Sequence, residues 1–155
     1  MVIRFAEEKD LDRVNELRKQ VSELHAAGRP ETFKAGFSDE LRDYIQVIWN
    51  DPDKQIVVAE TKGAICGFAV LRHIQKLETS YKQGDDCLDI DEFGVDDSCR
   101  RQGVATELIR FIREYAKEQG LRRIELNMWE FNRSALAFYE AVGFSTFRRY
   151  MEMTL

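Results

Sequence analysis

Apolar residues recur at helical spacing in the first third of the chain. After a short apolar run at 2–5, which predicts a strand, a helix is expected to begin at Asp10. Its apolar face consists of Leu11, Val14, Leu17, Val21 and Leu24. The segment 25–37 is interrupted by glycines and a proline and therefore predicts a loop. Ser38 can then cap a second helix, which stops before Asp51.

β-branched and alternating apolar residues replace this spacing in the middle of the chain. The runs 55–61 and 64–74 predict two strands, and the lysine and glycine at 62–63 predict a hairpin between them. Another strand is expected at 88–95. A further strand is expected at 122–129, where apolar residues occupy every second position.

Two more helices complete the predicted order. One follows the turn 100–105 and ends at Gly120, because glycine suits the residue after a helix C-terminus. Asn132 can cap a shorter helix that ends at Gly143, and 144–155 predicts a last strand. The order β-α-α-β-β-β-α-β-α-β predicts a mixed sheet with helices on its faces, an α/β (mixed α+β) fold in one domain over 1–155.

Composition narrows the classes of function. The chain has 155 residues, 44% of them apolar and 33% charged, as in ordinary globular domains. Neither a membrane span nor a secretory signal is expected, because no long apolar run occurs and the N-terminus soon becomes charged. The net charge of −5 gives no reason to expect a nucleic-acid partner. Three cysteines without paired spacing, and only two histidines, argue against disulfides and a metal site and fit a reducing cytoplasm.

The turn at 100–105 carries candidate chemistry. Its sequence, RRQGVA, places two arginines where a helix begins, although cations are disfavoured at that end of a helix. A bound anion would resolve this conflict, since the first backbone N–H groups of a helix are unpaired. The candidate binding residues are Arg100, Arg101, Gln102, Gly103, Val104, Ala105 and Thr106. The alternative is a solvent-exposed basic turn with a glycine at its corner. Neither the P-loop pattern nor the dinucleotide pattern G-x-G-x-x-G occurs in the chain.

Two motifs resemble those of the GNAT superfamily of N-acetyltransferases. R-x-x-G-x-A at 100–105 resembles its acyl-CoA-binding motif, [QR]-x-x-G-x-[GA]. The segment 126–144 resembles the family pattern N-x-x-A-x-x-x-Y-x-x-x-G-F, and the matching residues are Asn132, Ala135, Tyr139, Gly143 and Phe144. The predicted order of elements is also similar to the GNAT fold, although the specific resemblance covers only about residues 88 to 150.

The resemblance implies an acetyl-CoA site where the strands 88–95 and 122–129 splay apart. Main-chain groups of Phe93, Gly94 and Val95 would then pair with the pantetheine arm. The pyrophosphate would rest on 101–105, and Asn132 would contact the arm. Gly94 would suit the β-bulge that many members have in this strand.

The implied reaction is direct transfer of acetyl to a primary amine of a small molecule or a peptide. Tyr139 occupies the position of the family's general acid, although its spacing alone favours a core tyrosine. A homodimer is common in the family. The alternative is a non-catalytic protein that binds acyl-CoA as a sensor.

The base is left open between Asp91 and Glu92, or a water molecule. Alternation puts Asp89 and Asp91 on the face of Phe93, with Glu92 on the other face, and a bulge near Gly94 would break this parity. These acids favour a cationic amine as acceptor. The loop 25–37 and residues 129–131 are expected to frame the acceptor side, as equivalent regions do in the family.

Overall fold

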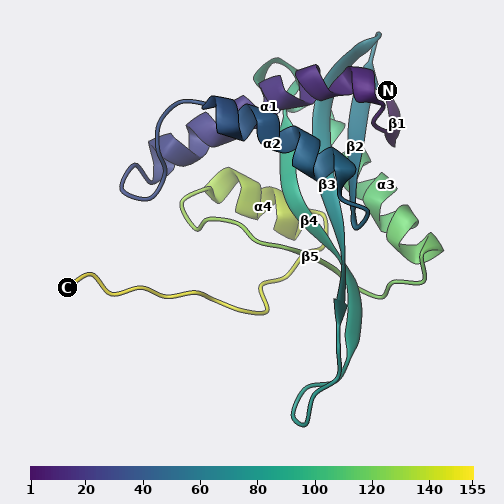
Figure 1. Ribbon diagram of the computed structural model, residues 1–155, viewed down its shortest axis with the longest axis vertical. Coiled ribbons are helices and arrows are strands. Elements are labelled where there is room, and N and C mark those ends of the chain that lie inside the picture. The colour runs from purple at the N-terminus through teal and green to yellow at the C-terminus, as the bar shows by residue number, and fades with distance from the viewer.

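Five strands form one mixed sheet in the computed structural model, which describes residues 1–155 (Figure 1). The strands lie in the order β1-β2-β3-β4-β5, and every neighbouring pair is antiparallel except β4 and β5, which are parallel. Their bounds are Val2–Phe5 (β1), Lys54–Thr61 (β2), Ala64–Lys76 (β3), Asp85–Val95 (β4) and Ile124–Leu126 (β5). The end of the β3–β4 hairpin extends away from the rest of the molecule (Figure 1).

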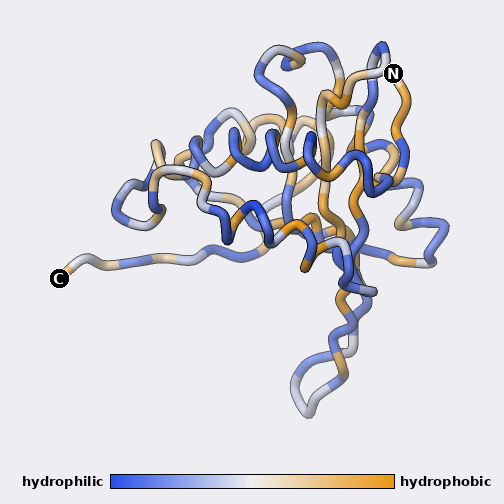
Figure 2. The backbone as a smooth tube through the Cα atoms, turned by 45° about the horizontal axis from the view of Figure 1, so that its top comes forward, coloured by the Kyte–Doolittle hydropathy of each residue, from blue (hydrophilic) through white to orange (hydrophobic).

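Four α-helices cover the two faces of this sheet. They are α1 (Leu11–Gly28), α2 (Asp39–Asn50), α3 (Val104–Glu118) and α4 (Arg133–Ala141), and short 3-10 helices occupy Glu8–Asp10 and Asp97–Cys99. Buried residues of α1 and α2 pack on one face, and α3 packs on the other with partly buried residues of α4. The apolar stretches of the chain accordingly lie mainly in the central strands (Figure 2). No helix combines the length and the hydropathy needed to cross a bilayer.

Local signals identified the start of α2, the end of α3 and the first hairpin correctly. The N–H of Leu41 donates to the Ser38 hydroxyl at 3.3 Å, which confirms the predicted cap of α2. Lys62 and Gly63 have φ values of +53° and +79°, as a tight hairpin turn between β2 and β3 requires. Gly120, with φ +73°, follows the end of α3.

Three expected elements differ from the structure. The helix α1 continues through His25 to Gly28, so the predicted loop over 25–37 starts only after it. The strand expected at 122–129 is reduced to Ile124–Leu126. The last strand, expected at 144–155, is not formed, and no strand of the sheet pairs with these residues. The mixed α/β fold class is confirmed, and the predicted order holds as far as α4.

Candidate active site

The strands β4 and β5 separate after a short stretch of parallel pairing. Leu88, Asp89 and Ile90 pair with the three residues of β5, and beyond Ile90 only β3 pairs with β4. The main-chain groups on the other edge of 91–95 therefore have no strand partner. This free edge includes Phe93, Gly94 and Val95, and an extended ligand can pair with it as a strand would.

A β-bulge lies at Asp91 and decides which face each acid occupies. Val70 pairs with Glu92 and Leu71 with Ile90, which leaves Asp91 as the extra residue. The bulge was expected near Gly94, and that expectation is wrong. The predicted parity is wrong as well, because Asp89 and Glu92 share the face of α1 and α2.

Packing explains why residue 94 is a glycine. A Cβ at Gly94 would lie 2.7 Å from a ring carbon of Phe68 and 2.9 Å from a methyl of Val21. The same holds at Gly67 in β3, where a Cβ would lie 2.9 Å from Val104 and 3.1 Å from the carbonyl oxygen of Gly94. Gly94 thus lets Val21 of α1 pack closely on β4, and Gly67 lets Val104 at the start of α3 pack closely on β3.

The turn before α3 presents free backbone amides. The first helical bond runs from the N–H of Glu107 to the carbonyl of Gly103 at 3.0 Å, so the amides of Val104, Ala105 and Thr106 have no helical partner. Gly103 has φ +83°, and nothing lies within 4 Å of a Cβ built on it. Arg101 is also left-handed, with φ +59°. The turn is therefore an open cradle of donors, to which α3 adds the positive end of its dipole.

The side chains of this turn differ in how they are held. An ion pair of 2.5 Å joins Arg100 to Asp97, and Gln102 donates to the carbonyl of Ser98 at 2.9 Å. Arg101 forms no ion pair and is exposed. Arg101 is thus the cation of the turn that is free to meet an anion.

Tyr139 lies on α4 in an aromatic environment beside β4. Its ring centroid is 6.1 Å from that of Phe93, 5.4 Å from Phe138 and 5.6 Å from Phe144. Burial raises the pKa of Tyr139 to about 12. Its hydroxyl makes no hydrogen bond with the protein, yet it is not a buried unpaired atom, so it reaches accessible space. Tyr139 is therefore a neutral phenol with a free donor.

Asn132 begins the same helix. Its side-chain oxygen accepts from the N–H of Ala135 at 3.1 Å and from the hydroxyl of Ser134 at 3.1 Å, which confirms the predicted cap. The oxygen is thus occupied within the protein. The side-chain NH₂ makes no hydrogen bond and remains a donor for a ligand.

Glu92 is held by a buried arginine. Arg18 Nε and Nη2 donate to the two carboxylate oxygens at 2.7 and 3.0 Å. Only 6% of the Arg18 side chain is exposed, and its Nη1 also donates to Asn15 Oδ1 at 2.8 Å and to the carbonyl of Leu41 at 2.9 Å. A single side chain thus connects α1, α2 and β4.

The other two acids of this face are paired as well. Lys54 Nζ lies 2.8 Å from Asp91 Oδ2, and Arg72 Nη2 lies 2.8 Å from Asp89 Oδ2 and 3.9 Å from Asp91 Oδ1. With Arg18 and Glu92, this face holds three acids and three bases. The acids therefore do not give it a net negative charge.

An aromatic cluster lies at the C-terminal end of α1. We define it as His25, Phe33, Trp129 and Phe131. The His25 ring stacks on Phe33 at 5.1 Å between centroids and meets Phe131 edge-on at 6.2 Å, while Trp129 meets Phe33 edge-on at 5.1 Å. Burial lowers the pKa of His25, although the negative charge of Glu92 opposes this shift. The loop after α1 and residues 129–131 thus come together, and their expected place beside the acceptor stays a prediction.

The sequence-based reasoning missed the partners of these acids. Arg18, Lys54 and Arg72 each pair with a residue on β4. One signal was available, because Arg18 lies four residues after Val14 and three before Val21, on the apolar face of the predicted helix. A charged residue at such a position requires a buried partner.

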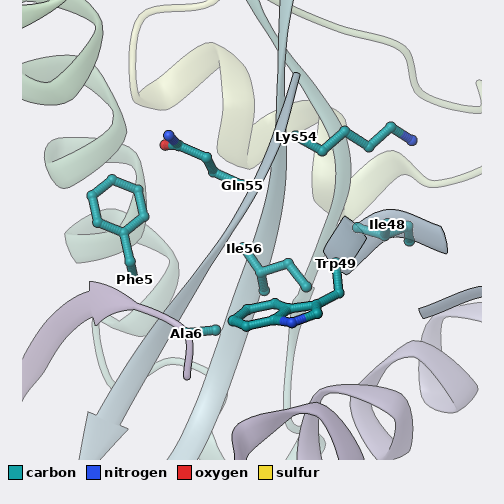
Figure 3. A pocket seen from close by; sticks show the side chains of 7 residues that line it. All are labelled: Phe5, Ala6, Ile48, Trp49, Lys54, Gln55 and Ile56. Carbon is teal, nitrogen blue, oxygen red and sulfur yellow. The ribbon is translucent and has the colours of Figure 1, made fainter. Parts of the chain in front are cut away.

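Other polar and hollow regions lie elsewhere. One hollow has a volume of about 220 Å³. It is lined by Phe5, Ala6, Ile48, Trp49, Lys54, Gln55 and Ile56, whose side chains Figure 3 shows. A second hollow of about 390 Å³ is lined by Arg4, Lys9, Asp10, Arg13, Glu60, Gly63, Ala64 and Ile65. Potential metal ligands of Asp85, Cys87 and Glu125 lie within 4.8 Å of one another, but Arg123 contacts both carboxylates.

Comparison with known proteins identifies the family. The model of the acetyltransferase (GNAT) family matches residues 3–144. The chain belongs to the GNAT family of acetyltransferases. An uncharacterized N-acetyltransferase of Methanocaldococcus jannaschii, MJ1207, is 31% identical over 108 residues, which are 66% of this chain and 44% of that protein. The chain spans less than half the length of the first curated relatives that it matches.

Solved structures share this GNAT fold. A mutant of the BH1408 protein from Bacillus halodurans is 26% identical and has a TM-score of 0.95, with 100% of this chain and 99% of that chain covered. The aminoglycoside N-acetyltransferase AAC(6')-Iy, solved in complex with CoA, has a TM-score of 0.76 at 19% identity, with 99% and 93% covered. At that identity the second likeness concerns the fold alone.

Proposed function

We propose that the chain is an acetyl-CoA-dependent N-acetyltransferase that transfers acetyl directly to a primary amine of a small molecule or a peptide. The observation that carries this proposal is that two free sets of main-chain groups lie near each other. A Cβ built at Gly67 lies 3.1 Å from the carbonyl oxygen of Gly94 and 2.9 Å from a methyl of Val104, so the strand β4, whose other edge at 91–95 is unpaired, runs close to the start of α3, whose first amides are also unpaired. An extended arm that ends in a pyrophosphate would satisfy both sets.

Each part of the cosubstrate has residues suited to it. The amides of Val104, Ala105 and Thr106 and the side chain of Arg101 would hold the pyrophosphate, with Arg100, Gln102 and Gly103 shaping the turn. Phe93, Gly94 and Val95 would pair with the pantetheine arm along the edge of β4. The free NH₂ of Asn132 would contact the arm from α4.

The chain's own residues would manage the protons of the transfer. The thioester of acetyl-CoA supplies the activated acetyl group. Tyr139 would donate its phenolic proton to the departing sulfur, since its hydroxyl has no acceptor in the protein and the phenol is protonated at neutral pH. Glu92, whose charge acts on the aromatic cluster through His25, would accept the amine proton through water. Asp91, paired with Lys54, would help to shape the bulge.

The acceptor would lie between Glu92 and the aromatic cluster. The acids of β4 are each paired with a base, so the charge argument for a cationic amine loses its force. Aromatic faces accept either an apolar group or a cation. AAC(6')-Iy, as its name states, is an aminoglycoside acetyltransferase, and aminoglycosides belong in the test with aromatic and anionic amines. Equal turnover of cationic and anionic amines would show that charge does not select the acceptor.

Calorimetric titration with acetyl-CoA tests the binding step. Gly103→Glu is expected to weaken binding at least about tenfold, because an anion enters the phosphate cradle and about 1.4 kcal/mol corresponds to tenfold. Gly63→Glu is the matched control, since Gly63 also has a positive φ, +79°, and open space around it, but lies in the β2–β3 turn. Equal weakening in both variants would contradict the proposed site.

Turnover separates the enzyme from the alternative, a non-catalytic acyl-CoA sensor. Both would bind acetyl-CoA, but only the enzyme would release free CoA thiol when an amine is added. The accessible phenol of Tyr139 favours the enzyme, because a sensor has no use for a proton donor beside the thioester. Binding without turnover over the whole amine panel would support the sensor.

A further inference from the structure

All three cysteines of the chain are free thiols, and two of them meet between β3 and the turn before α3. Cys66 is 8% exposed in β3, and Cys99 is half-buried at the end of the short 3-10 helix 97–99. The N–H of Asp96 donates to the carbonyl of Cys66 at 2.8 Å, and the N–H of Cys99 donates to the carbonyl of Asp96 at 2.9 Å. Two main-chain hydrogen bonds through Asp96 thus hold the two cysteines near each other.

A β-bulge directs the Cys66 side chain to the face of the sheet that α3 covers. The register of β2 against β3 shifts at this point and leaves Cys66 as the extra residue without a partner in β2. Its side chain and the Cβ direction of the next residue, Gly67, therefore share the face on which α3 packs. Cys99 packs against the same apolar core. The bulge thus brings one thiol to the side of the sheet where the other lies.

The two thiols are close enough to interact directly. Burial, followed by a hydrogen bond with the Cys99 thiol, raises the pKa of the Cys66 thiol. The Sγ of Cys66 also lies 3.6 Å from the carbonyl oxygen of Ala64, and the Sγ of Cys99 lies 3.7 Å from the hydroxyl of Ser98. Thiols are weak hydrogen-bonding groups, so neither contact prevents the two sulfurs from approaching each other.

A buried hydroxyl without a partner lies beside Cys66. Thr61 Oγ1 is buried and makes no hydrogen bond with the rest of the protein, which is uncommon for a buried polar atom. It lies near enough to Cys66 to lower the pKa of that thiol, against the larger effect of burial. A hydroxyl in this place can donate to the Cys66 sulfur once that sulfur is a thiolate. The surroundings of Cys66 therefore suit a thiol that reacts.

We propose that Cys66 and Cys99 form a reversible disulfide when a hydroperoxide oxidises the protein. Disulfides of proteins in a reducing compartment are usually transient, and many serve in redox sensing. The bond would join β3 to the residue before Arg100, at the base of the turn 100–105. The proposal concerns these two thiols and does not depend on the proposed acetyl transfer.

Cys99 reacts first, because it is the more accessible of the two thiols. Its sulfur attacks one oxygen of the hydroperoxide, the O–O bond breaks, and Cys99 becomes a sulfenic acid while the other oxygen leaves as water or an alcohol. The Cys66 sulfur then attacks Cys99 Sγ, forms the S–S bond and expels the sulfenic oxygen as water. Each departing oxygen takes up one thiol proton. Two electrons pass from the two sulfurs to the peroxide, so the reaction is balanced.

Cys87 provides a matched control within the same chain. It is a buried thiol, and burial raises its pKa as it does for Cys66. Cys87 lies near the start of β4, eight residues before Val95. At a rise of about 3.3 Å per residue, about 26 Å separates it from the end of β4 that lies beside Cys66 and Cys99. Cys87 is therefore out of reach of the other two sulfurs in the folded protein.

Peptide mapping of the wild type after treatment with hydrogen peroxide tests the disulfide. A protease that cleaves before aspartate places Cys66, Cys87 and Cys99 on separate peptides, 53–84, 86–88 and 97–155. After the remaining thiols are blocked, non-reducing mass spectrometry should show 53–84 linked to 97–155, with the loss of two of the three free thiols. Dithiothreitol should restore all three. Cys99→Ser should abolish the linked peptides, whereas Cys87→Ser should keep them.

Three outcomes would overturn the proposal. Peroxide-treated wild type without the linked peptides would show that the two sulfurs do not meet. Linked peptides in which 86–88 takes part would show that the pairing does not follow the folded structure. A non-reducing gel with a band of twice the chain mass in place of the internal link would show that Cys99 reacts between molecules. The internal link in the wild type and in Cys87→Ser, together with its absence from Cys99→Ser, supports the proposal.

Discussion

Tyr139 combines an apolar environment with an accessible hydroxyl. Its ring packs among Phe93, Phe138 and Phe144, and its phenol has no acceptor in the protein. The ring of Tyr139 therefore serves packing, and its hydroxyl is the group available for proton transfer. Removal of the hydroxyl alone separates the two roles.

Tyr139→Phe is expected to lower kcat by roughly 10²–10⁴-fold, the range of general acid–base catalysis, with little change in thermal stability. The ring and its contacts remain, so the variant should still bind acetyl-CoA. Steady-state kinetics with the best amine measure the loss, and calorimetric titration serves as the control. Unchanged kcat would mean that Tyr139 is a packing residue, as its spacing alone also allows.

The pH dependence of unfolding at alkaline pH provides a second test of Tyr139. The pKa of Tyr139 is raised from 10.0 to about 12, so the unfolded chain loses this proton at lower pH than the native chain. The stabilisation of the neutral phenol is complete below pH 10 and is lost as the pH rises toward 12. The free energy of unfolding, measured with urea, should therefore fall more steeply between these pH values in the wild type than in Tyr139→Phe. Parallel curves would contradict the burial of this phenol.

At the scale of elements, Arg18 joins three of them by one side chain. It donates to Glu92 of β4, to the carbonyl of Leu41 in α2 and to Asn15 of its own helix. Glu92 therefore keeps its place only while α1 and α2 keep theirs. The proposed acceptor side thus depends on packing between elements that are distant in sequence.

Arg18→Ala is expected to destabilise the fold by about 3–5 kcal/mol, the cost of breaking a buried ion pair and leaving one charge unpaired. Arg42→Ala is the control, because its 2.5 Å pair with Asp39 joins side chains that are 57% and 82% exposed. Such surface pairs contribute about 0–1 kcal/mol. Urea unfolding at pH 7 measures the loss of unfolding free energy in both variants. Equal losses would show that the Arg18–Glu92 pair stabilises the fold no more than a surface pair does.

Local patterns predicted elements well and pairings poorly. Ser38, Gly120 and Asn132 were found because a cap depends on a few adjacent residues. The bulge at Asp91 was misplaced, because it is set by how β3 pairs with β4. The ion pair of Arg18 and Glu92 joins residues 74 positions apart, and no local pattern names that partner.

The candidate site also has parts that the local sequence predicts and parts that depend on residues distant in sequence. The turn 100–105 was predicted from its own residues, because unpaired amides follow from the start of a helix. The pairing of the acids on β4 depends on Arg18, Lys54 and Arg72 from other elements. The strand expected at 144–155 was predicted from alternation alone, which does not show whether another strand pairs with it, and in the structure none does.

At the scale of the whole molecule, a buried carboxylate ties the end of β4 to α1. Asp96 accepts from the amide of Ser98 at 2.8 Å and its hydroxyl at 2.5 Å, and from Arg13 of α1 at 2.5 Å. Gln20 of α1 adds a bond of 3.3 Å. The hydrogen bonds from Ser98, followed by that from Arg13, hold the pKa of the Asp96 carboxyl far below its usual range. This makes the stability of the fold sensitive to acid.

Asp96→Asn tests that link through the pH dependence of unfolding. Because the pKa of Asp96 is lowered in the native state, its stabilisation is complete well above the ordinary value of 3.8 and is lost as the pH falls below it. The variant should lose roughly 1.5–3 kcal/mol at pH 7, the contribution of hydrogen bonds to a charged group, and should depend less on pH below 4. Asp53→Asn, at an exposed position, should follow the wild type throughout. Urea titrations between pH 7 and 2.5 measure all three proteins. Equal acid sensitivity in Asp96→Asn and the wild type would mean that other carboxylates, such as Asp10 beside Arg4, carry the acid response of the molecule.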